Sequence, residues 1–211
     1  MLIEKVGKSG TLMFPTYNWD FCKGIEFDYK KTMSFCGALS NTALKRKDFL
    51  RTKNPIYSFA VTGKDKDLIC NMKHDNCFSL NSPFGYLIKN KGKNLFIDLH
   101  YRIGGFPFVH LAEQQVGVKY RFLKIFTGNY IDDSNNKSKV NYSMYVRDPK
   151  SKVAITFIHE KFDDILKKIN AYKEVFLDEI SLTMIDIEKA YSHLVEDLKN
   201  GGDLIYTKKT N

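Results

Sequence analysis

The chain has 211 residues, of which 43% are hydrophobic and 14% aromatic, enough to bury a substantial core, and this length fits one domain over residues 1–211 better than two. Lys and Arg total 33 against 24 for Asp and Glu, and the net charge of +9 favours anionic partners such as nucleic acids, phosphates or nucleotides. Because the basic residues are scattered and no nucleic-acid-binding motif accompanies them, we do not expect nucleic acid as a partner.

Two features of the sequence predict a cytoplasmic protein. The stretch MLIEKVGKSGTLMF (1–14) lacks the apolar run of a signal peptide, and no stretch approaches the roughly 18 apolar residues of a membrane span, so we expect no membrane partner. A chain of this size without a secretion signal normally keeps its thiols reduced. The cysteines expected to form no disulfides are Cys22, Cys36, Cys70 and Cys77.

Short apolar runs rich in β-branched and aromatic residues recur along the chain and predict strands. These runs are TLMFPT (11–16), IYSFAVT (56–62), NLFIDLH (94–100) and YRFLKIFTG (120–128). Helical segments lie between several of them, and this alternation is typical of a layered α/β fold. The polar run 132–136, DDSNN, is prone to turns and predicts a surface loop.

Start and stop signals predict two helices in the middle of the chain. Ser82 and Pro83 supply an N-cap and a first-turn proline for a helix that ends near Gly92. After a flexible corner at 104–105, Pro107 suits the start of the next helix, and Gly117 suits its end.

Two further helices are predicted outside this region. The densest basic run, KRK at 45–47, follows apolar positions and fits the solvated end of a helix. The segment 185–202 ends in two glycines and carries its apolar residues along one helical face. These apolar residues are Ile187, Ala190, Leu194 and Leu198.

The pair His110 and Glu113 is the candidate for chemistry. A separation of three residues places both side chains on one face of the predicted helix, where the carboxylate can orient the imidazole and stabilise its charge. Such a pair can serve as a general base. The spacing also arises by chance, so the alternative is a histidine that merely lies on a helix.

A metal site is the other chemical candidate. The cluster Cys70, His74, Asp75 and Cys77 lies close together in sequence, but tetrahedral zinc sites usually show paired short cysteine spacings or a second ligand pair elsewhere. The alternative is two buried cysteines beside a polar turn. We expect no metal.

Several sequence blocks together resemble the aminoglycoside 3-N-acetyltransferase family, which is of the antibiotic N-acetyltransferase type. They are GTLMFPTYNWDFCKGIEFD, TMSFCGALSN, KNPIYSFAVTGKD and FVHLAEQQVGVKYRFLKIFTG. The resemblance covers most of the chain and is closest to members associated with surface-polysaccharide loci. It implies a three-layer α/β/α sandwich around a mixed sheet.

The resemblance also implies an activity and residue roles. In the family, acetyl-CoA donates its acetyl group directly to an amine of an amino sugar, and the histidine of the His-x-x-Glu block is the base. Here that histidine is His110, with Glu113 beside it. Ser58 and Phe59 resemble positions along the coenzyme arm. No covalent enzyme intermediate and no metal are implied.

The acceptor is a small amino sugar, either an aminoglycoside antibiotic or a nucleotide-linked sugar of a surface polysaccharide. Its cationic amines call for carboxylates, and the acidic residues of the WDFCKGIEFD block, Asp20 and Glu26, are the candidates. The sequence does not choose between the acceptors and does not indicate the oligomeric state.

Three departures from the family pattern support a second hypothesis. The family has a further N-terminal segment with a histidine-serine-serine stretch, which is expected to be missing here. Asn54 stands where histidine is common, and Pro107 stands where a threonine precedes the catalytic histidine. The alternative is therefore a non-catalytic remnant of the family that binds sugar or a partner protein.

Overall fold

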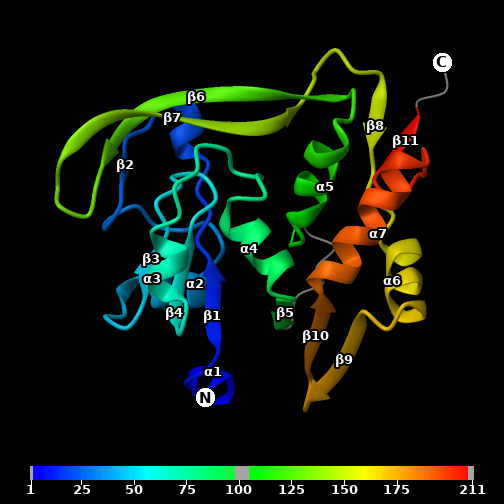
Figure 1. Cartoon of the computed structure of the whole chain (residues 1–211), viewed down its shortest axis with the longest axis horizontal. Helices are drawn as coiled ribbons and strands as arrows, with labels where there is room; N and C mark the ends of the chain where they lie inside the picture. Colours follow the sequence, from blue (N-terminus) through cyan, green and yellow to red (C-terminus); the bar gives the residue numbers. More distant parts are fainter. Residues whose placement is uncertain (1, 98–104, 209–211) are drawn as a thin grey trace. The chain divides into compact units, whose positions relative to one another are not determined.

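The computed structural model describes residues 2–97 and 105–208. Contacts divide the chain into two compact units. Figure 1 shows the helices and strands of the chain, coloured along the sequence. The first unit comprises Met1–Pro83 and Lys124–Met144, and the second comprises Phe84–Leu123 and Tyr145–Asn211. The expectation of one domain over residues 1–211 stays a prediction.

An antiparallel sheet of order β1-β4-β3 forms the centre of the first unit. Its strands are β1 (Thr11–Pro15), β4 (Phe59–Gly63) and β3 (Leu50–Arg51). The first four residues of β4 are buried, and Ala60 packs with Ala43 and Phe49 in an apolar cluster. The helices of this unit are α1 (Leu2–Val6), the 3-10 helix η1 (Asp20–Lys23), α2 (Ala38–Lys45) and α3 (Lys66–Cys70).

A long pair of strands, β6 (Arg121–Ile131) and β7 (Lys137–Arg147), continues from the first unit into the second. In the first unit, β2 (Phe27–Asp28) adds to β6 in parallel, with Phe27 opposite Tyr130. The turn that joins β6 to β7 is held by Asp132, whose Oδ1 accepts hydrogen bonds from the backbone N–H groups of Ser134 and Asn136 at 2.8 Å each. The predicted loop at 132–136 is confirmed.

The second unit contains an antiparallel sheet of order β5-β10-β9. Its strands are β5 (Lys93–Ile97), β10 (Ile180–Asp186) and β9 (Tyr172–Leu177). A second pairing joins β8 (Val153–Ile155) to β11 (Tyr206–Lys208). The helices are α4 (Pro83–Lys89), which starts at the boundary between the units, α5 (Phe108–Val116), α6 (His159–Lys168) and α7 (Ile187–Lys199).

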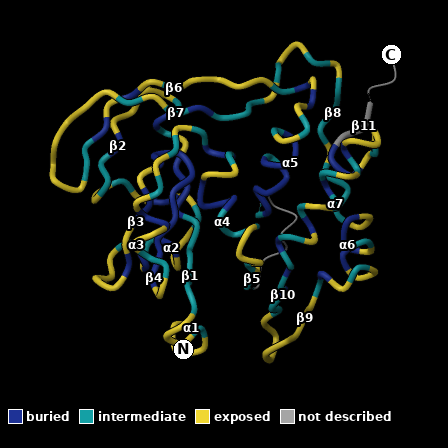
Figure 2. Tube along the Cα trace, in the orientation of Figure 1, coloured by how far each residue is buried: buried dark blue, intermediate teal, exposed yellow. Residues whose placement is uncertain are grey.

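Helices α5 and α7 pack against each other, and both are partly buried (Figure 2). The side chain of Asp186 caps α7 by accepting a hydrogen bond from the N–H of Lys189 at 3.2 Å. The buried residues of α7 are the four predicted from the helical spacing, Ile187, Ala190, Leu194 and Leu198. The basic run at 45–47 lies at the exposed end of α2, as predicted.

The predicted α/β class is confirmed, although the strands of the described chain fall into four small sheets. The run 56–62 forms a strand only from Phe59. Its first residues are held in a turn because Asn54 Oδ1 accepts hydrogen bonds from the backbone N–H groups of Ile56 and Tyr57, each at 2.9 Å. Residues 98–100 of the predicted strand 94–100, and Gly104 of the predicted corner, lie outside the described residues.

The helix that carries His110 and Glu113 begins and ends where the sequence predicts. Pro107 is its N-cap residue, with φ −64° and ψ −9°, and the N–H of His110 donates to the carbonyl of Pro107 at 2.9 Å. Gly117 is its C-cap in the left-handed conformation, with φ 71° and ψ 47°, and its N–H donates to the carbonyls of Glu113 and Gln114. Proline therefore fixes the entry to α5, and glycine fixes its exit.

Replacing Gly117 with Ala should lower the free energy of unfolding by about 1–2 kcal/mol, because a side chain disfavours the left-handed conformation. No atom lies within 4 Å of the added Cβ, so the loss comes from the backbone alone. Gly117→Asn should cost less, since Asn adopts this conformation more readily. Thermal unfolding measures both, and equal losses for the two variants would contradict the assignment.

Candidate active site

Helix α5 brings His110 and Glu113 into direct contact. The distance from His110 Nδ1 to Glu113 Oε2 is 2.9 Å. The Glu113 side chain is completely buried, whereas 33% of the His110 side chain is exposed. When the Nδ1–H group donates a hydrogen bond to the carboxylate, Nε2 of the neutral imidazole carries a lone pair that can accept a proton. The predicted pair thus has the geometry of a base and its orienting carboxylate.

A third charged residue completes the cluster. Arg121, the first residue of β6, places Nε 2.7 Å from Glu113 Oε2, and 11% of its side chain is exposed. Its Nη1 also donates to the carbonyl of Tyr145 at 3.3 Å. The sequence did not single out Arg121. A glutamate on the buried face of a helix indicates that some cation is needed, but the spacing does not select one among 33 Lys and Arg residues.

The environment of Glu113 sets its charge. Burial alone would raise the pKa of Glu113, but the hydrogen bond from His110, the positive charge of His110 when its ring is protonated, and the positive charge of Arg121 outweigh burial and hold the pKa below its ordinary value. Glu113 is therefore a carboxylate at neutral pH. A buried, ionised carboxylate accepts a hydrogen bond from the Nδ1–H group of a neutral imidazole and so fixes the orientation of the ring.

Ser58 and Phe59 lie in the first unit, whereas His110 and Glu113 lie in the second. Ser58 is fully buried, and its hydroxyl donates to the carbonyl of Thr16 at 2.8 Å. Phe59 is 4% exposed. Their assignment to the coenzyme arm stays a prediction, and the burial of the Ser58 hydroxyl gives that side chain a structural task.

The hydroxyl of Ser58 also accepts a hydrogen bond from Nε of Arg51 at 3.0 Å. The Arg51 guanidinium is buried and donates to the carbonyls of Thr32 at 2.6 Å and Thr16 at 3.2 Å. It also lies 4.6 Å from the centre of the Phe27 ring. Burial lowers the pKa of Arg51 to about 10, so the group stays charged at neutral pH. Arg51 therefore ties together the loops around β1 and β4.

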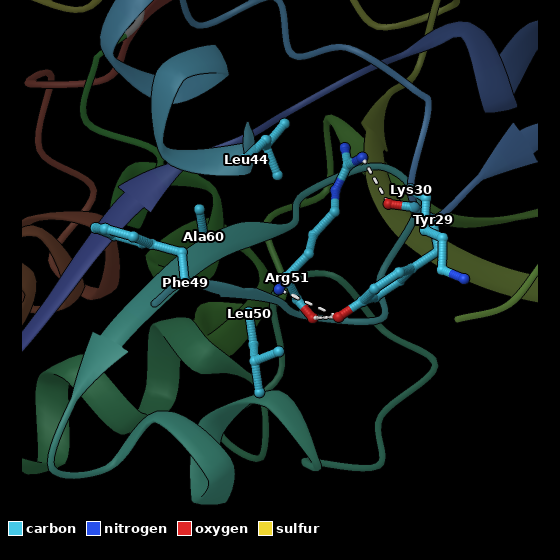
Figure 3. A pocket seen from close by; sticks show the side chains of 7 residues that line it. All are labelled: Tyr29, Lys30, Leu44, Phe49, Leu50, Arg51 and Ala60. Atoms are coloured by element: carbon cyan, nitrogen blue, oxygen red, sulfur yellow. Dashed lines mark hydrogen bonds between the residues drawn. The ribbon is translucent and has the colours of Figure 1, made fainter. Parts of the chain in front are cut away.

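Arg51 also lines a cavity of about 170 Å³ in the first unit (Figure 3). Tyr29 closes one side, where its hydroxyl contacts the backbone of Arg51. The other lining residues are Lys30, Leu44, Phe49, Leu50 and Ala60. The Arg51 guanidinium beside this cavity already donates its hydrogen bonds to carbonyl and hydroxyl oxygens of the protein. The residues around the cavity therefore belong to the structural framework of the unit.

Asp20 and Glu26 line one pocket of about 210 Å³ in the first unit. Each is paired with a surface lysine, Asp20 with Lys23 at 2.9 Å and Glu26 with Lys137 at 3.5 Å. The walls of the pocket include three exposed apolar side chains, Ile25, Met33 and Phe35. Two carboxylates and three apolar side chains that line one pocket can hold a cationic, partly apolar ligand, because ion pairs with exposed lysines are weak and easily exchanged.

The Cys70–Cys77 segment has the features of two buried cysteines beside a polar turn, which is the alternative to a metal site. Both cysteines are buried free thiols, and burial raises the pKa of each to about 12. His74 Nδ1 contacts the carbonyl of Asn76 at 3.0 Å, and Asn54 Nδ2 contacts the sulfur of Cys77 at 3.5 Å. Within residues 2–97 and 105–208, no three His, Cys, Asp or Glu residues are arranged to hold a metal ion.

The fold and the His–Glu pair on α5 point to one class of protein. A family model described as aminoglycoside 3-N-acetyltransferase matches residues 1–199. The chain belongs to this family, whose name states an N-acetyltransferase activity. No curated protein sequence matches the chain. The closer resemblance to members associated with surface-polysaccharide loci stays a prediction.

Solved structures share the fold at low sequence identity. Aminoglycoside acetyltransferase AAC(3)-Xa is 14% identical, with a TM-score of 0.73 over 92% of this chain and 76% of that chain. AAC-IIIb, solved as a binary complex with CoASH, is 13% identical, with a TM-score of 0.74 over 93% and 80%. AAC-VIa, solved bound to sisomicin, is 15% identical, with a TM-score of 0.75 over 96% and 83%. In the part of the chain that the structure describes, no helix has the length and apolar character of a membrane span.

Replacing Ser58 with Ala should lower the free energy of unfolding by about 1–3 kcal/mol, because the change removes the hydroxyl that pairs with the buried Nε of Arg51 and with the buried hydroxyl of Thr16. Urea unfolding measures the loss. Ser134→Ala, in the exposed turn between β6 and β7, is the matched control and should change stability little. A loss for Ser58→Ala no larger than for the control would show that the Arg51 network adds nothing to stability.

Proposed function

We propose that the protein is an acetyl-CoA-dependent N-acetyltransferase that acetylates an amine of an amino sugar, with His110 as general base. Membership of the family supports the reaction type, and the solved CoASH complex of AAC-IIIb supports the donor. The observation that carries the assignment of the base is the 2.9 Å contact between His110 and a fully buried Glu113.

The proposed reaction requires a base. An amino-sugar amine is largely ammonium at neutral pH and must lose a proton before its nitrogen can attack a thioester carbonyl. His110 Nε2 accepts that proton, and Glu113 holds the ring and stabilises the imidazolium that results. Acetyl-CoA supplies the acetyl group as an activated thioester. The amide bond forms as the carbon–sulfur bond breaks, and the second proton lost by the nitrogen goes to the leaving thiolate, so that the coenzyme departs as its thiol.

The pocket containing Asp20 and Glu26 is the proposed acceptor site. Ammonium groups of a sugar would replace the lysines now paired with the two carboxylates, and the apolar wall would contact the sugar ring. The solved complex of AAC-VIa with sisomicin supports a cationic amino sugar as acceptor. Ser58 and Phe59 remain the proposed positions along the coenzyme arm. The proposed location is the cytoplasm.

His110→Ala should lower the rate of thiol release from acetyl-CoA by about 10² to 10⁴ with an accepted amino sugar, because it removes the general base. Glu113→Gln should cost less, since the base remains. His193→Ala, on α7, is the matched control for loss of an imidazole and should keep its activity.

The assay uses a panel of aminoglycosides and nucleotide-linked amino sugars, with unfolding curves to confirm that each variant is folded. Full activity of His110→Ala would remove His110 from the mechanism. Thiol release no faster than background for the wild-type protein, with every acceptor, would favour the non-catalytic alternative.

Asp20→Asn and Glu26→Gln should raise the acceptor KM with little change in kcat, because each removes a charge that acts on the bound sugar rather than on the reacting amine. A charge-assisted contact is worth about 1.5–3 kcal/mol, which corresponds to roughly tenfold or more in KM. Asp48→Asn, an exposed carboxylate paired with Arg46, is the control. An unchanged KM in both pocket variants would move the acceptor site elsewhere.

A further inference from the structure

Arg121 contacts the carboxylate that orients the proposed base, on the same oxygen that His110 contacts. Nε of Arg121 lies 2.7 Å from Glu113 Oε2, the same oxygen that His110 Nδ1 contacts at 2.9 Å. All three residues belong to the second unit. One carboxylate oxygen thus stands between a residue that changes its charge and one that does not, because arginine stays protonated in proteins.

We infer that Arg121 is a positioning residue of the His110 base: its permanent charge keeps Glu113 ionised while His110 is neutral. The inference rests on the proposed function, in which neutral His110 accepts the proton of the acceptor amine. Arg121 acts on the base through its contact with Glu113.

The need for Arg121 follows from the burial of Glu113. A fully buried carboxylate beside a neutral imidazole is one uncompensated negative charge, which is costly in a medium of low dielectric constant. Without a second cation, the His110–Glu113 pair would lower this cost by binding a proton. A proton on His110 would occupy the base, and a proton on Glu113 would remove the charge that supports the imidazole. With Arg121 in place, the carboxylate is neutralised before any proton is bound.

Backbone contacts fix the position of Arg121. Its Nη1 donates to the carbonyl of Tyr145 on β7, and the Tyr145 hydroxyl donates to the carbonyl of Val118 at 2.7 Å. The N–H of Asp148 donates to the carbonyl of Tyr120 at 2.9 Å. The start of β6 is therefore fastened to the end of β7, and the guanidinium is held in place at the carboxylate.

The contact acts mainly through charge. Within the described chain, Arg121 Nε and Glu113 Oε1 are buried without an aligned hydrogen-bond partner, although Nε and Oε2 are close. A further titratable group beside the cluster is the Tyr145 phenol, whose pKa is raised by burial and by Glu113 and lowered by Arg121. Helix α7, which packs against α5, contributes the buried apolar residues Ile187, Ala190, Leu194 and Leu198.

The test compares pH profiles of kcat/KM for acetyl transfer. Each profile has an acidic limb, along which kcat/KM falls because the base becomes protonated. In Arg121→Gln, this limb should move to higher pH by roughly one unit or more, because removing a positive charge increases the proton affinity of the His110–Glu113 pair. Arg121→Lys keeps the charge and should keep the limb near its wild-type position. Arg147→Gln removes an exposed charge on β7 and is the control for net charge.

The double variant Glu113→Gln/Arg121→Gln separates a charge effect from a structural one. It removes both buried charges, so the limb should return toward its wild-type position although two residues are changed. A purely structural role of Arg121 predicts instead that the double variant is no better than the single one. The double variant also replaces the single one as a test if Arg121→Gln alone does not fold.

A second readout does not depend on activity. In ¹⁵N NMR spectra of histidine-labelled protein, the His110 ring should take up its proton at higher pH in Arg121→Gln than in the wild-type protein, and Arg121→Lys should restore the wild-type curve. Unchanged curves and an unchanged kinetic limb would overturn the inference. If the wild-type protein transfers no acetyl group, the proposed function fails, and the NMR comparison still decides the role of Arg121.

Discussion

The carboxylate of Glu113, placed where water does not reach it, is the constraint on which the second unit depends. A buried charge must be compensated, and the chain compensates it from both sides of a single turn: His110 lies on α5 before the turn, and Arg121 begins β6 after it. The left-handed Gly117 ends the helix between them. Helix end, turn and strand start are thus required together, because a shift in any of them would leave the carboxylate unpaired.

The first unit handles a buried charge differently. Arg51 is surrounded by carbonyl and hydroxyl oxygens and by the Phe27 ring. Neutral acceptors can satisfy a guanidinium because its charge is spread over several donors, and the result is a cross-link between loops rather than a reactive group. One unit therefore uses a buried ion to build its framework, while the other places a buried ion pair beside a partly exposed histidine.

Local signals in the sequence predicted much of the fold. The strand runs, the four buried residues of α7 and the limits of α5 follow from periodicity and from proline and glycine, which act within a few residues. The start of β4 was missed because the Asn54 side chain takes the backbone N–H groups that a longer strand would use. Within the candidate site, helical spacing predicted the His110–Glu113 contact. The contact of Arg121 with Glu113 could not be predicted, because it depends on the tertiary packing that brings the start of β6 beside α5.

The burial of the cysteines bears on how cleanly a thioester could be handled. A thiol attacks an acyl group only as its thiolate. Burial raises the pKa of Cys22 to about 11, the pKa values of Cys70 and Cys77 to about 12, and the pKa of Cys36 above its ordinary value. All four side chains are therefore protonated at neutral pH. A protein that works on an activated acyl donor, as proposed here, thus carries little nucleophilic sulfur of its own, and unwanted self-acylation at cysteine is suppressed by the same packing that holds its core.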